Sequence, residues 1–259
     1  MKSFNTKIIA ISNQKGGVGK TTSAVNIASF LAITETPTLI IDMDPQANAT
    51  SGLGIDTSSS SNLSIYDVLI NNKSLTQCIT KTEIDFLDII PSNSKLAGAE
   101  IELVSMFTRE AVLKEALLSV KGKYKYIIID SPPSLGLLTI NVLTASNSVI
   151  IPIQCEYYAL EGLSQLLNTI RLIQKNLNKH LNIEGILITM YDSRLNLSKQ
   201  VISEVQEYFG DKVYQTYINR NVRLGEAPSH GKPIILYDPS STGSNNYMNL
   251  VTEILNQND

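Results

Sequence analysis

Cysteine and long apolar segments are scarce in this sequence. Its two cysteines, Cys78 and Cys155, lie far apart and form no Cys-x-x-Cys pair, which argues against a disulfide framework and a thiolate metal site. No apolar run is long enough to cross a bilayer, and the N-terminus leads through a short apolar run into a glycine-rich loop, unlike a signal peptide. We therefore expect a cytoplasmic protein in which both cysteines are ordinary buried side chains.

An excess of positive charge is also missing. The 21 lysines and arginines are outnumbered by 24 acidic residues, so the net charge is −3. This balance argues against a protein coated in positive charge, and any contact with nucleic acid would have to come from a local patch.

What the chain does have is the length and pattern of one α/β domain. Its 259 residues, 43% of them apolar and 17% charged, are enough to bury a substantial core, and no repeat or composition shift marks a second domain. Apolar runs typical of buried strands alternate with segments of helical spacing, which predicts a mostly parallel, doubly wound sheet with helices on both faces. The predicted strands are Lys7–Ser12, Thr38–Asp42, Phe86–Ile90, Tyr126–Asp130, Val149–Ile153 and Ile183–Thr189, and the predicted helices are Lys20–Ala32, Ala99–Val120, Ala159–Asn176 and Ser198–Phe209.

Two shorter features complete the predicted organisation. Residues 57–62 read as a serine-rich surface loop, and Ser64 is placed to cap a short helix that runs through Val68. In the long predicted helix, apolar side chains fall on one broad face, namely Leu103, Met106, Phe107, Leu113, Leu117 and Val120.

A phosphate-binding loop follows the first predicted strand and precedes the first predicted helix. Glycines let successive backbone N–H groups point into one concavity, where the positive end of the helix adds to the attraction for a polyphosphate. Lys20 would neutralise the terminal phosphates of ATP, and the Thr21 hydroxyl would ligate Mg²⁺. The general GxxxxGK[ST] pattern is altered at its first position, Gln14, and an additional lysine, Lys15, lies within the loop. The predicted nucleotide-binding residues are Lys15, Gly16, Gly17, Val18, Gly19, Lys20, Thr21 and Thr22.

Carboxylates end two of the predicted strands. Asp130 closes one of them, at the edge of a parallel sheet where ligands bind, and could hold the Mg²⁺ shell through water; the alternative is a strand-end turn. Asp42 and Asp44 end another strand, where a carboxylate can orient the water that attacks the γ-phosphate. We assign this catalytic role to Asp44, beside Lys15 and Lys20, while Asp42 could equally be structural.

Together these residues resemble the ParA/Soj family of partition ATPases, within the deviant Walker A group that also contains MinD. The resemblance covers nearly the whole chain. It rests on NQKGGVGKTT at 13–22, IDMDPQANATSGLG at 41–54, IIIDSPPSLGLLTINVL at 127–143 and NRNVRLGEAPSHGKPI at 219–234. Two departures from the family pattern, Asn219 and Gly225, leave the shape of the loop from Arg220 to Pro228 less defined.

The resemblance implies a partition ATPase with slow, partner-stimulated turnover. It implies an ATP-dependent sandwich homodimer in which Lys15 reaches the partner's phosphates, non-specific binding of that dimer to double-stranded DNA, and stimulation by a ParB-like centromere-binding protein. It also places Pro228 near the adenine. Because the chain begins almost at the first strand, it resembles the short chromosomal type without an N-terminal helix-turn-helix domain. The implied location is the cytoplasm, in association with the nucleoid, and the cargo is a chromosome or a plasmid.

The predicted DNA contacts are three arginines in the C-terminal third, Arg194, Arg220 and Arg223. Arginine suits phosphate because its planar fork makes two parallel hydrogen bonds and keeps its charge. The alternative is a solvated face or, for Arg220 and Arg223, structural pairing with Glu226 and the nucleotide site.

Two other functions share parts of this pattern. A MinD-like membrane ATPase would have the same phosphate site but needs an amphipathic anchor with cationic residues, and residues 245–259 contain no lysine or arginine. An electron carrier like the nitrogenase iron protein would need cysteine thiolates around an iron–sulfur cluster, and no supporting motif surrounds Cys78 or Cys155.

Overall fold

The computed structural model describes residues 3–56, 63–156 and 159–258 of the chain. The serine-rich loop predicted at 57–62 lies outside these residues. Ser64 caps the helix α3 (Ile65–Leu69) as predicted, and its backbone N–H donates to Asp67 Oδ2 at 2.9 Å, which completes a capping box.

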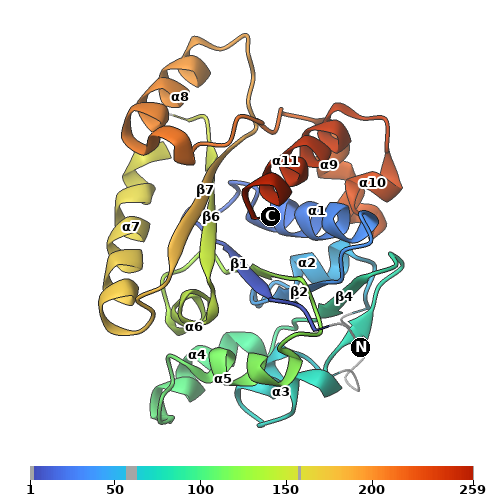
Figure 1. Cartoon of the computed structure of the whole chain (residues 1–259), viewed down its shortest axis with the longest axis vertical. Helices are drawn as coiled ribbons and strands as arrows, with labels where there is room; N and C mark the ends of the chain where they lie inside the picture. Colours follow the sequence, from blue (N-terminus) through green and yellow to red (C-terminus); the bar gives the residue numbers. More distant parts are fainter. Residues whose placement is uncertain (1–2, 57–62, 157–158, 259) are drawn as a thin grey trace.

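A seven-stranded sheet forms the centre of the molecule, in the order β3-β4-β2-β5-β1-β6-β7 (Figure 1). Every pairing between these strands is parallel except that of β3 with β4. The central strands are rich in isoleucine and almost wholly buried, as expected when helices cover both faces. The predicted fold class is therefore confirmed. The strands are β1 (Lys7–Ile11), β2 (Thr38–Asp42), β3 (Thr80–Lys81), β4 (Leu87–Ile90), β5 (Tyr126–Asp130), β6 (Ser148–Gln154) and β7 (Asn182–Thr189).

Successive residues of each strand feed two separate cores. Ile9 and Ile11 of β1 belong to the core under α1 and α11, whereas Ala10 between them belongs to the core under α3 to α8. This alternation follows from the two-residue period of a strand. The helices are α1 (Lys20–Ile33), α2 (Asn48–Gly52), α3, α4 (Leu96–Glu102), α5 (Val112–Leu117), α6 (Leu137–Ala145), α7 (Ala159–Asn176), α8 (Asn196–Phe209), α9 (Val222–Glu226), α10 (Ile234–Tyr237) and α11 (Thr242–Asn258). Short 3₁₀ turns are η1 (Leu75–Gln77), η2 (Leu103–Ser105), η3 (Leu118–Val120), η4 (Gly210–Lys212) and η5 (Ala227–His230).

The long helix predicted over Ala99–Val120 is wrong. The chain leaves the helical conformation at Met106, which is extended, and Thr108 then takes a left-handed φ of +53°. An α-helix cannot continue through such residues. Phe107, expected on the buried face, is 97% exposed. The apolar spacing instead comes from separate short helices, whose buried members are Leu103, Leu113, Leu117 and Val120.

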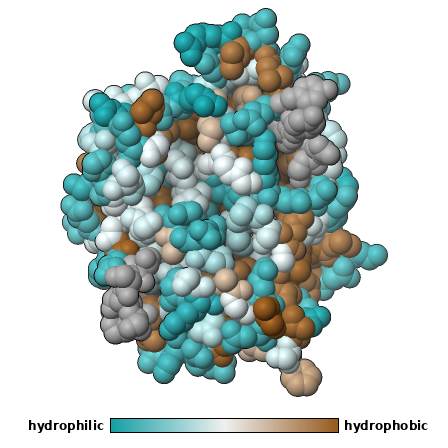
Figure 2. All heavy atoms as spheres, turned by 180° about the vertical axis from the view of Figure 1, so that it is seen from behind, coloured by the Kyte–Doolittle hydropathy of each residue, from teal (hydrophilic) through white to brown (hydrophobic). Residues whose placement is uncertain are grey.

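The surface is largely polar. On the face shown in Figure 2, teal and white side chains predominate, and brown ones gather mainly along the lower right. In the ranges that the structure describes, no helix combines the length and apolar character that a membrane span requires.

Three chain segments with polar side chains meet at one edge of the sheet. The pairing register places Ile11 of β1 beside Asp130 of β5, and Asp130 beside Asp42 of β2. Because the strands are parallel, their carboxyl ends share this edge, and the loop after β1 opens there as well.

Candidate functional site: a phosphate loop with three carboxylates

The loop between β1 and α1 is shaped by glycines. Gly17 and Gly19 adopt left-handed φ values of +75° and +83°, which side-chain-bearing residues rarely adopt. A Cβ placed on Gly16 or Gly17 would meet no described atom within 4 Å, so the space in front of the loop is open. Gly19 is the N-cap of α1, and no side-chain cap is present there within the described structure. The uncapped N–H groups and the helix dipole make this opening suitable for an anion such as a polyphosphate.

Side chains from the sheet hold the loop in place. Asn13 Nδ2 donates to the Pro152 carbonyl at 2.7 Å, and Asn13 Oδ1 accepts from the Lys15 N–H at 3.0 Å. On the other side, the Thr189 hydroxyl donates to the Val18 carbonyl at 2.9 Å. The loop is thus tied to the ends of β6 and β7 before any ligand binds. Sequence reasoning missed both anchors: Asn13 belongs to the motif at 13–22, but nothing in that motif names Pro152 as its acceptor, and Thr189 belongs to no motif.

Lys20 lies inside the loop. The residue is only 6% exposed, and its Nζ donates a hydrogen bond to the Lys15 carbonyl at 2.9 Å. Burial lowers the pKa of Lys20, while the charges of Asp130 and Asp44 oppose that shift. The structure therefore brings Lys20 together with the two carboxylates that the sequence predicted beside it.

The second loop lysine points elsewhere. Lys15 Nζ forms an ion pair with Glu156 Oε2 at 2.7 Å, just beyond the end of β6, and both side chains are partly exposed. The other oxygen of Glu156 accepts from Gln154 Nε2 at 2.6 Å. In this conformation Lys15 is bound to its own chain.

Asp42 and Asp44 differ in their surroundings. Asp42 is fully buried, and its carboxylate accepts from the Thr50 N–H at 2.9 Å, the Thr50 hydroxyl at 2.7 Å and the Asp44 N–H at 3.1 Å. Burial raises the pKa of Asp42 to about 6, although these hydrogen bonds oppose the rise. Asp42 therefore has the structural role that the sequence left open for it. Asp44 is 7% exposed and accepts from the Gln46 N–H at 2.9 Å.

Asp130 is the least satisfied side chain of the site. It is completely buried, and neither carboxylate oxygen has a hydrogen-bond partner of ordinary geometry within the described ranges. Burial raises the pKa of Asp130 well above its usual range, and the charge of Asp42 raises it further, while Thr21 and Lys20 oppose the shift. An unpartnered buried carboxylate beside a threonine hydroxyl is what a hydrated Mg²⁺ requires, so these residues fit the predicted metal.

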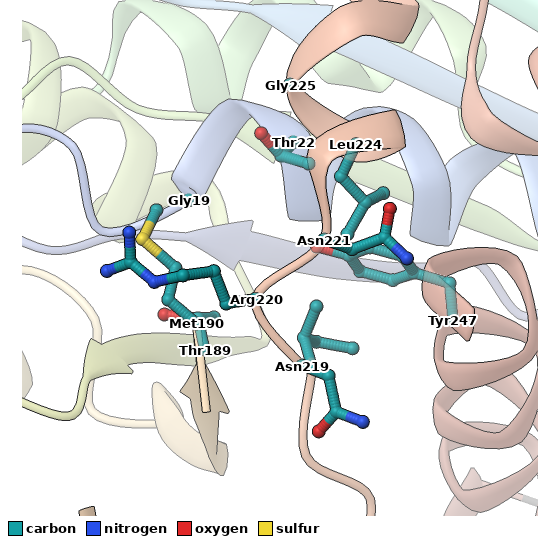
Figure 3. Close-up of a pocket in the computed structure, with 11 residues that line it drawn as sticks. Gly19, Thr22, Thr189, Met190, Asn219, Arg220, Asn221, Leu224, Gly225 and Tyr247 are labelled. Carbon is teal, nitrogen blue, oxygen red and sulfur yellow. The ribbon is translucent and has the colours of Figure 1, made fainter. Parts of the chain in front are cut away.

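A pocket of about 240 Å³ lies beside the loop (Figure 3). In the figure, Met190 and Arg220 lie near Gly19, and Leu224 and Asn221 face them from the α9 side. The lining of this pocket is mainly apolar with a few polar groups. Such a lining suits the base of a nucleotide whose phosphates occupy the loop. Pro228 is not in this lining. It lines a neighbouring pocket of about 250 Å³ with Thr21 and Asn26, so its predicted place near the adenine stays a prediction.

The three predicted DNA-contacting arginines have acidic or nucleotide-site neighbours. Arg194 is highly exposed and donates to both oxygens of Asp192, at 2.9 and 2.6 Å, which lowers the Asp192 pKa to about 2. Arg223 pairs with Glu226 at 2.9 Å and with Asp238 at 3.4 Å. Arg220 lines the pocket of Figure 3. The structural pairing considered for Arg223 is therefore present, and Arg220 lies at the pocket beside the phosphate loop.

The cysteines are both buried and free, as the sequence predicted. Burial raises the pKa of each thiol to about 11, which keeps Cys78 and Cys155 protonated at neutral pH and unsuited to metal binding. Across the described residues, no group of three or more His, Cys, Asp or Glu side chains is arranged to hold a metal by itself.

Comparisons with known proteins agree with this geometry. A family model described as an AAA domain matches residues 6–183. The sporulation initiation inhibitor protein Soj of Bacillus subtilis is 61% identical over 248 residues, which cover 96% of this chain and 98% of Soj. The chromosome partitioning protein ParA of Myxococcus xanthus is 53% identical, with 96% of this chain and 88% of that protein covered. A structure of cobyrinic acid a,c-diamide synthase from Mycobacterium smegmatis, with bound ADP and magnesium, is 34% identical with a TM-score of 0.85, and the match covers 97% of this chain and 95% of that one.

Proposed function

This chain belongs to the ParA/Soj family of chromosome-partitioning ATPases, and we propose that it is a Mg-ATP-driven switch that moves DNA by binding and releasing it. One observation carries the proposal. The uncapped N-terminus of α1 carries the buried ammonium of Lys20, which interacts electrostatically with the buried Asp130 carboxylate, and neither oxygen of Asp130 has a hydrogen-bond partner of ordinary geometry in the described ranges. Each of these groups is costly to bury alone, and each is satisfied by a magnesium-bound triphosphate.

In this proposal the loop from Gly16 to Thr22 holds the phosphates of ATP. Lys20 neutralises the terminal phosphates, and the base occupies the pocket of Figure 3. Thr21 would hold Mg²⁺ directly and Asp130 would hold it through water. The metal would supply positive charge that stabilises the negative charge of the phosphates.

Asp44 orients the water that attacks the γ-phosphate. One of its oxygens is held by the Gln46 N–H, and its charge acts on the Lys20 ammonium, which supports a place beside the terminal phosphate. Orientation, more than basicity, is what phosphoryl transfer asks of this residue. Turnover should be slow until a partner completes the site, because switch proteins use hydrolysis as a timer.

ATP also joins two chains in a sandwich homodimer. Lys15 leaves Glu156 and contacts the phosphates bound to the partner subunit. This exchange is favourable because a triphosphate carries more negative charge than the single carboxylate of Glu156. Gly16 is exposed and has open space in front of it, as a close approach between two loops requires.

The dimer binds double-stranded DNA without sequence preference through Arg194 and Arg223, with Arg220, which lines the pocket of Figure 3, as the weaker candidate. If each subunit makes about two phosphate contacts, the dimer makes about four, and log affinity falls with log salt at a slope of about −4. Contacts to phosphates carry no base information, so unrelated duplexes should bind alike. Hydrolysis stimulated by a ParB-like protein then releases the protein from the nucleoid, and it diffuses in the cytoplasm before it binds DNA again.

Two substitutions test the assignment of the ATPase site. Lys20→Ala should lose nucleotide affinity, since it removes ground-state phosphate binding, whereas Asp44→Ala should bind ATP and accumulate as the ATP-bound dimer. Calorimetry gives the affinity, and size-exclusion light scattering gives the oligomeric state. An equal loss of ATP binding in both variants would contradict this division of roles, and an ATP-bound Asp44→Ala monomer would contradict the sandwich dimer.

A salt series tests the DNA surface. The ATP-bound Asp44→Ala dimer is titrated with unrelated duplexes, alone and with Arg223→Glu added. Unchanged affinity in a variant that still forms the dimer would assign Arg223 to its contacts with Glu226 and Asp238 alone.

A MinD-like membrane ATPase is the second candidate, and the structure offers it little support. The apolar face of α11 is already buried against α1 through Tyr247, Leu250, Val251 and Ile254. An interfacial anchor needs a free apolar face with cations beside it. Co-sedimentation with vesicles in the presence of ATP would distinguish the two functions.

A further inference from the structure

The turn after β4 reaches the catalytic edge of the sheet through one serine. Ser92 lies two residues beyond β4, is 2% exposed, and comes from a part of the chain that carries no nucleotide-binding motif. Its hydroxyl donates to the Asp44 carbonyl at 2.7 Å, and its N–H donates to the Thr50 hydroxyl at 2.9 Å. Both hydrogen bonds are buried, so water does not compete for them.

These contacts close a ring with Asp42. The Thr50 hydroxyl, which accepts from Ser92, donates in turn to Asp42, and the other oxygen of Asp42 accepts from the Asp44 N–H. Asp44 is therefore held at its N–H by Asp42 and at its carbonyl by Ser92. The residue after Asp44 is Pro45, which restricts the Asp44 backbone to extended conformations. Little freedom remains in the backbone that carries the Asp44 carboxylate.

We propose that Ser92 is a positioning residue for hydrolysis, which sets the orientation of Asp44 without touching ATP. This inference rests on the proposed role of Asp44 in orienting the attacking water. A group that orients the attacking water must be placed accurately, because a displacement of about 1 Å can reduce the rate of the chemical step about 100-fold. Thr50 extends the same support, because it connects Ser92 to Asp42.

Ser92→Ala is the direct test. It should lower kcat about tenfold, leave the KM for ATP unchanged, and let the ATP-bound dimer accumulate as in Asp44→Ala, because only the transition state needs the oriented carboxylate. A matched control is Ser146→Ala, which removes another buried serine hydroxyl that donates to a carbonyl, here that of Val142 at 2.7 Å. The control should keep the wild-type kcat, and its melting temperature shows what a lost hydroxyl does to stability alone.

A second pair of variants covers the case in which Ser92→Ala does not fold. Thr50→Val keeps the side-chain shape but removes the hydroxyl that links Ser92 to Asp42, whereas Thr50→Ser keeps the hydroxyl. The positioning role predicts a reduced kcat for Thr50→Val and recovery in Thr50→Ser, with ATP affinity retained in both. Equal kcat values in these two variants would overturn it.

The double variant separates this inference from the proposed function. If Ser92 acts through Asp44, adding Ser92→Ala to Asp44→Ala should not lower the residual rate further. Normal hydrolysis by Asp44→Ala would refute the proposed role of Asp44 itself. An inactive Asp44→Ala with a wild-type kcat for Ser92→Ala would refute the positioning role alone.

Discussion

Asp42 and Asp130 form a natural pair for a test of stability against function. They lie side by side in the register of β2 and β5 and are equally buried, at 0% exposure. Asp42 accepts three hydrogen bonds, whereas neither oxygen of Asp130 has a partner of ordinary geometry in the described part of the chain. Replacement of each by asparagine should therefore change the free energy of unfolding in opposite directions.

The expected magnitudes follow from these contacts. Asp130→Asn removes a buried, unpartnered carboxyl group and keeps its size, so the nucleotide-free protein should gain about 1–2 kcal/mol. Asp42→Asn keeps one acceptor oxygen and replaces the other with an NH₂ group, so either the two Thr50 donors or the Asp44 N–H lose their buried acceptor, which should cost about 1–3 kcal/mol. For a chain of this size each kcal/mol corresponds to about 2–4 °C in melting temperature.

The assay is thermal and urea unfolding in EDTA without nucleotide, repeated with Mg-ATP. Wild type should gain stability from Mg-ATP through the binding free energy, and Asp130→Asn should gain much less because the metal loses its support. If both variants shift the nucleotide-free melting temperature in the same direction, the contrast drawn between the two aspartates is wrong. If Asp130→Asn keeps the full Mg-ATP gain, Asp130 does not support the metal.

Three further predictions concern the loop, the acid range and the DNA face. Gly16→Val should stay folded and bind ATP but remain monomeric by light scattering, because a branched side chain blocks the approach of two loops; an ATP-bound dimer of normal affinity would contradict this. Burial raises the pKa of Asp42 from 3.8 to about 6 and raises that of Asp130 as well, so the folded state binds more protons than the unfolded state in this range. The contribution of these two groups to the free energy of unfolding should therefore fall as pH rises from about 4 to about 6, and it should fall less steeply in Asp130→Asn. If the pH dependence of the free energy of unfolding is the same in wild type and Asp130→Asn, the raised pKa of Asp130 is wrong. Asp192→Asn frees Arg194 from its ion pair and should raise the DNA affinity of the ATP-bound dimer about two- to fivefold at low salt, an effect that high salt removes; no change at any salt would exclude Arg194 as a contact.

Much of the site could be predicted because its signals are local. A strand followed by a glycine loop and a helix places Lys20 and Thr21 without knowledge of the rest of the chain, and parallel strands bring their carboxyl ends to one edge. In the structure, Asp44 and Asp130 lie near enough to Lys20 for their charges to act on its ammonium group. The two-residue edge strand β3 carries no such signal and was not predicted.

The failures have a common physical cause, which is that they depend on contacts between distant residues. Apolar spacing over Ala99–Val120 fits one helix, but the left-handed conformation of Thr108 divides it. The supports of the site from Asn13, Ser92 and Thr189 join segments far apart in the chain, and a serine or threonine after a strand has no pattern that names its acceptor.

The sequence by itself determined the fold class, the phosphate loop and the acidic strand ends, because each depends on neighbouring residues and on the geometry that all parallel sheets share. Only the tertiary structure decided which aspartate is satisfied and which is left for a ligand. Asp42 and Asp130 are the same residue type at the same strand position, but Asp42 accepts hydrogen bonds from Thr50 and Asp44, whereas neither oxygen of Asp130 has a partner of ordinary geometry in the described ranges. The contact of Thr50 with Asp42 depends on how α2 packs against β2, and the residue types of the motif at 41–54, which contains both residues, do not name it.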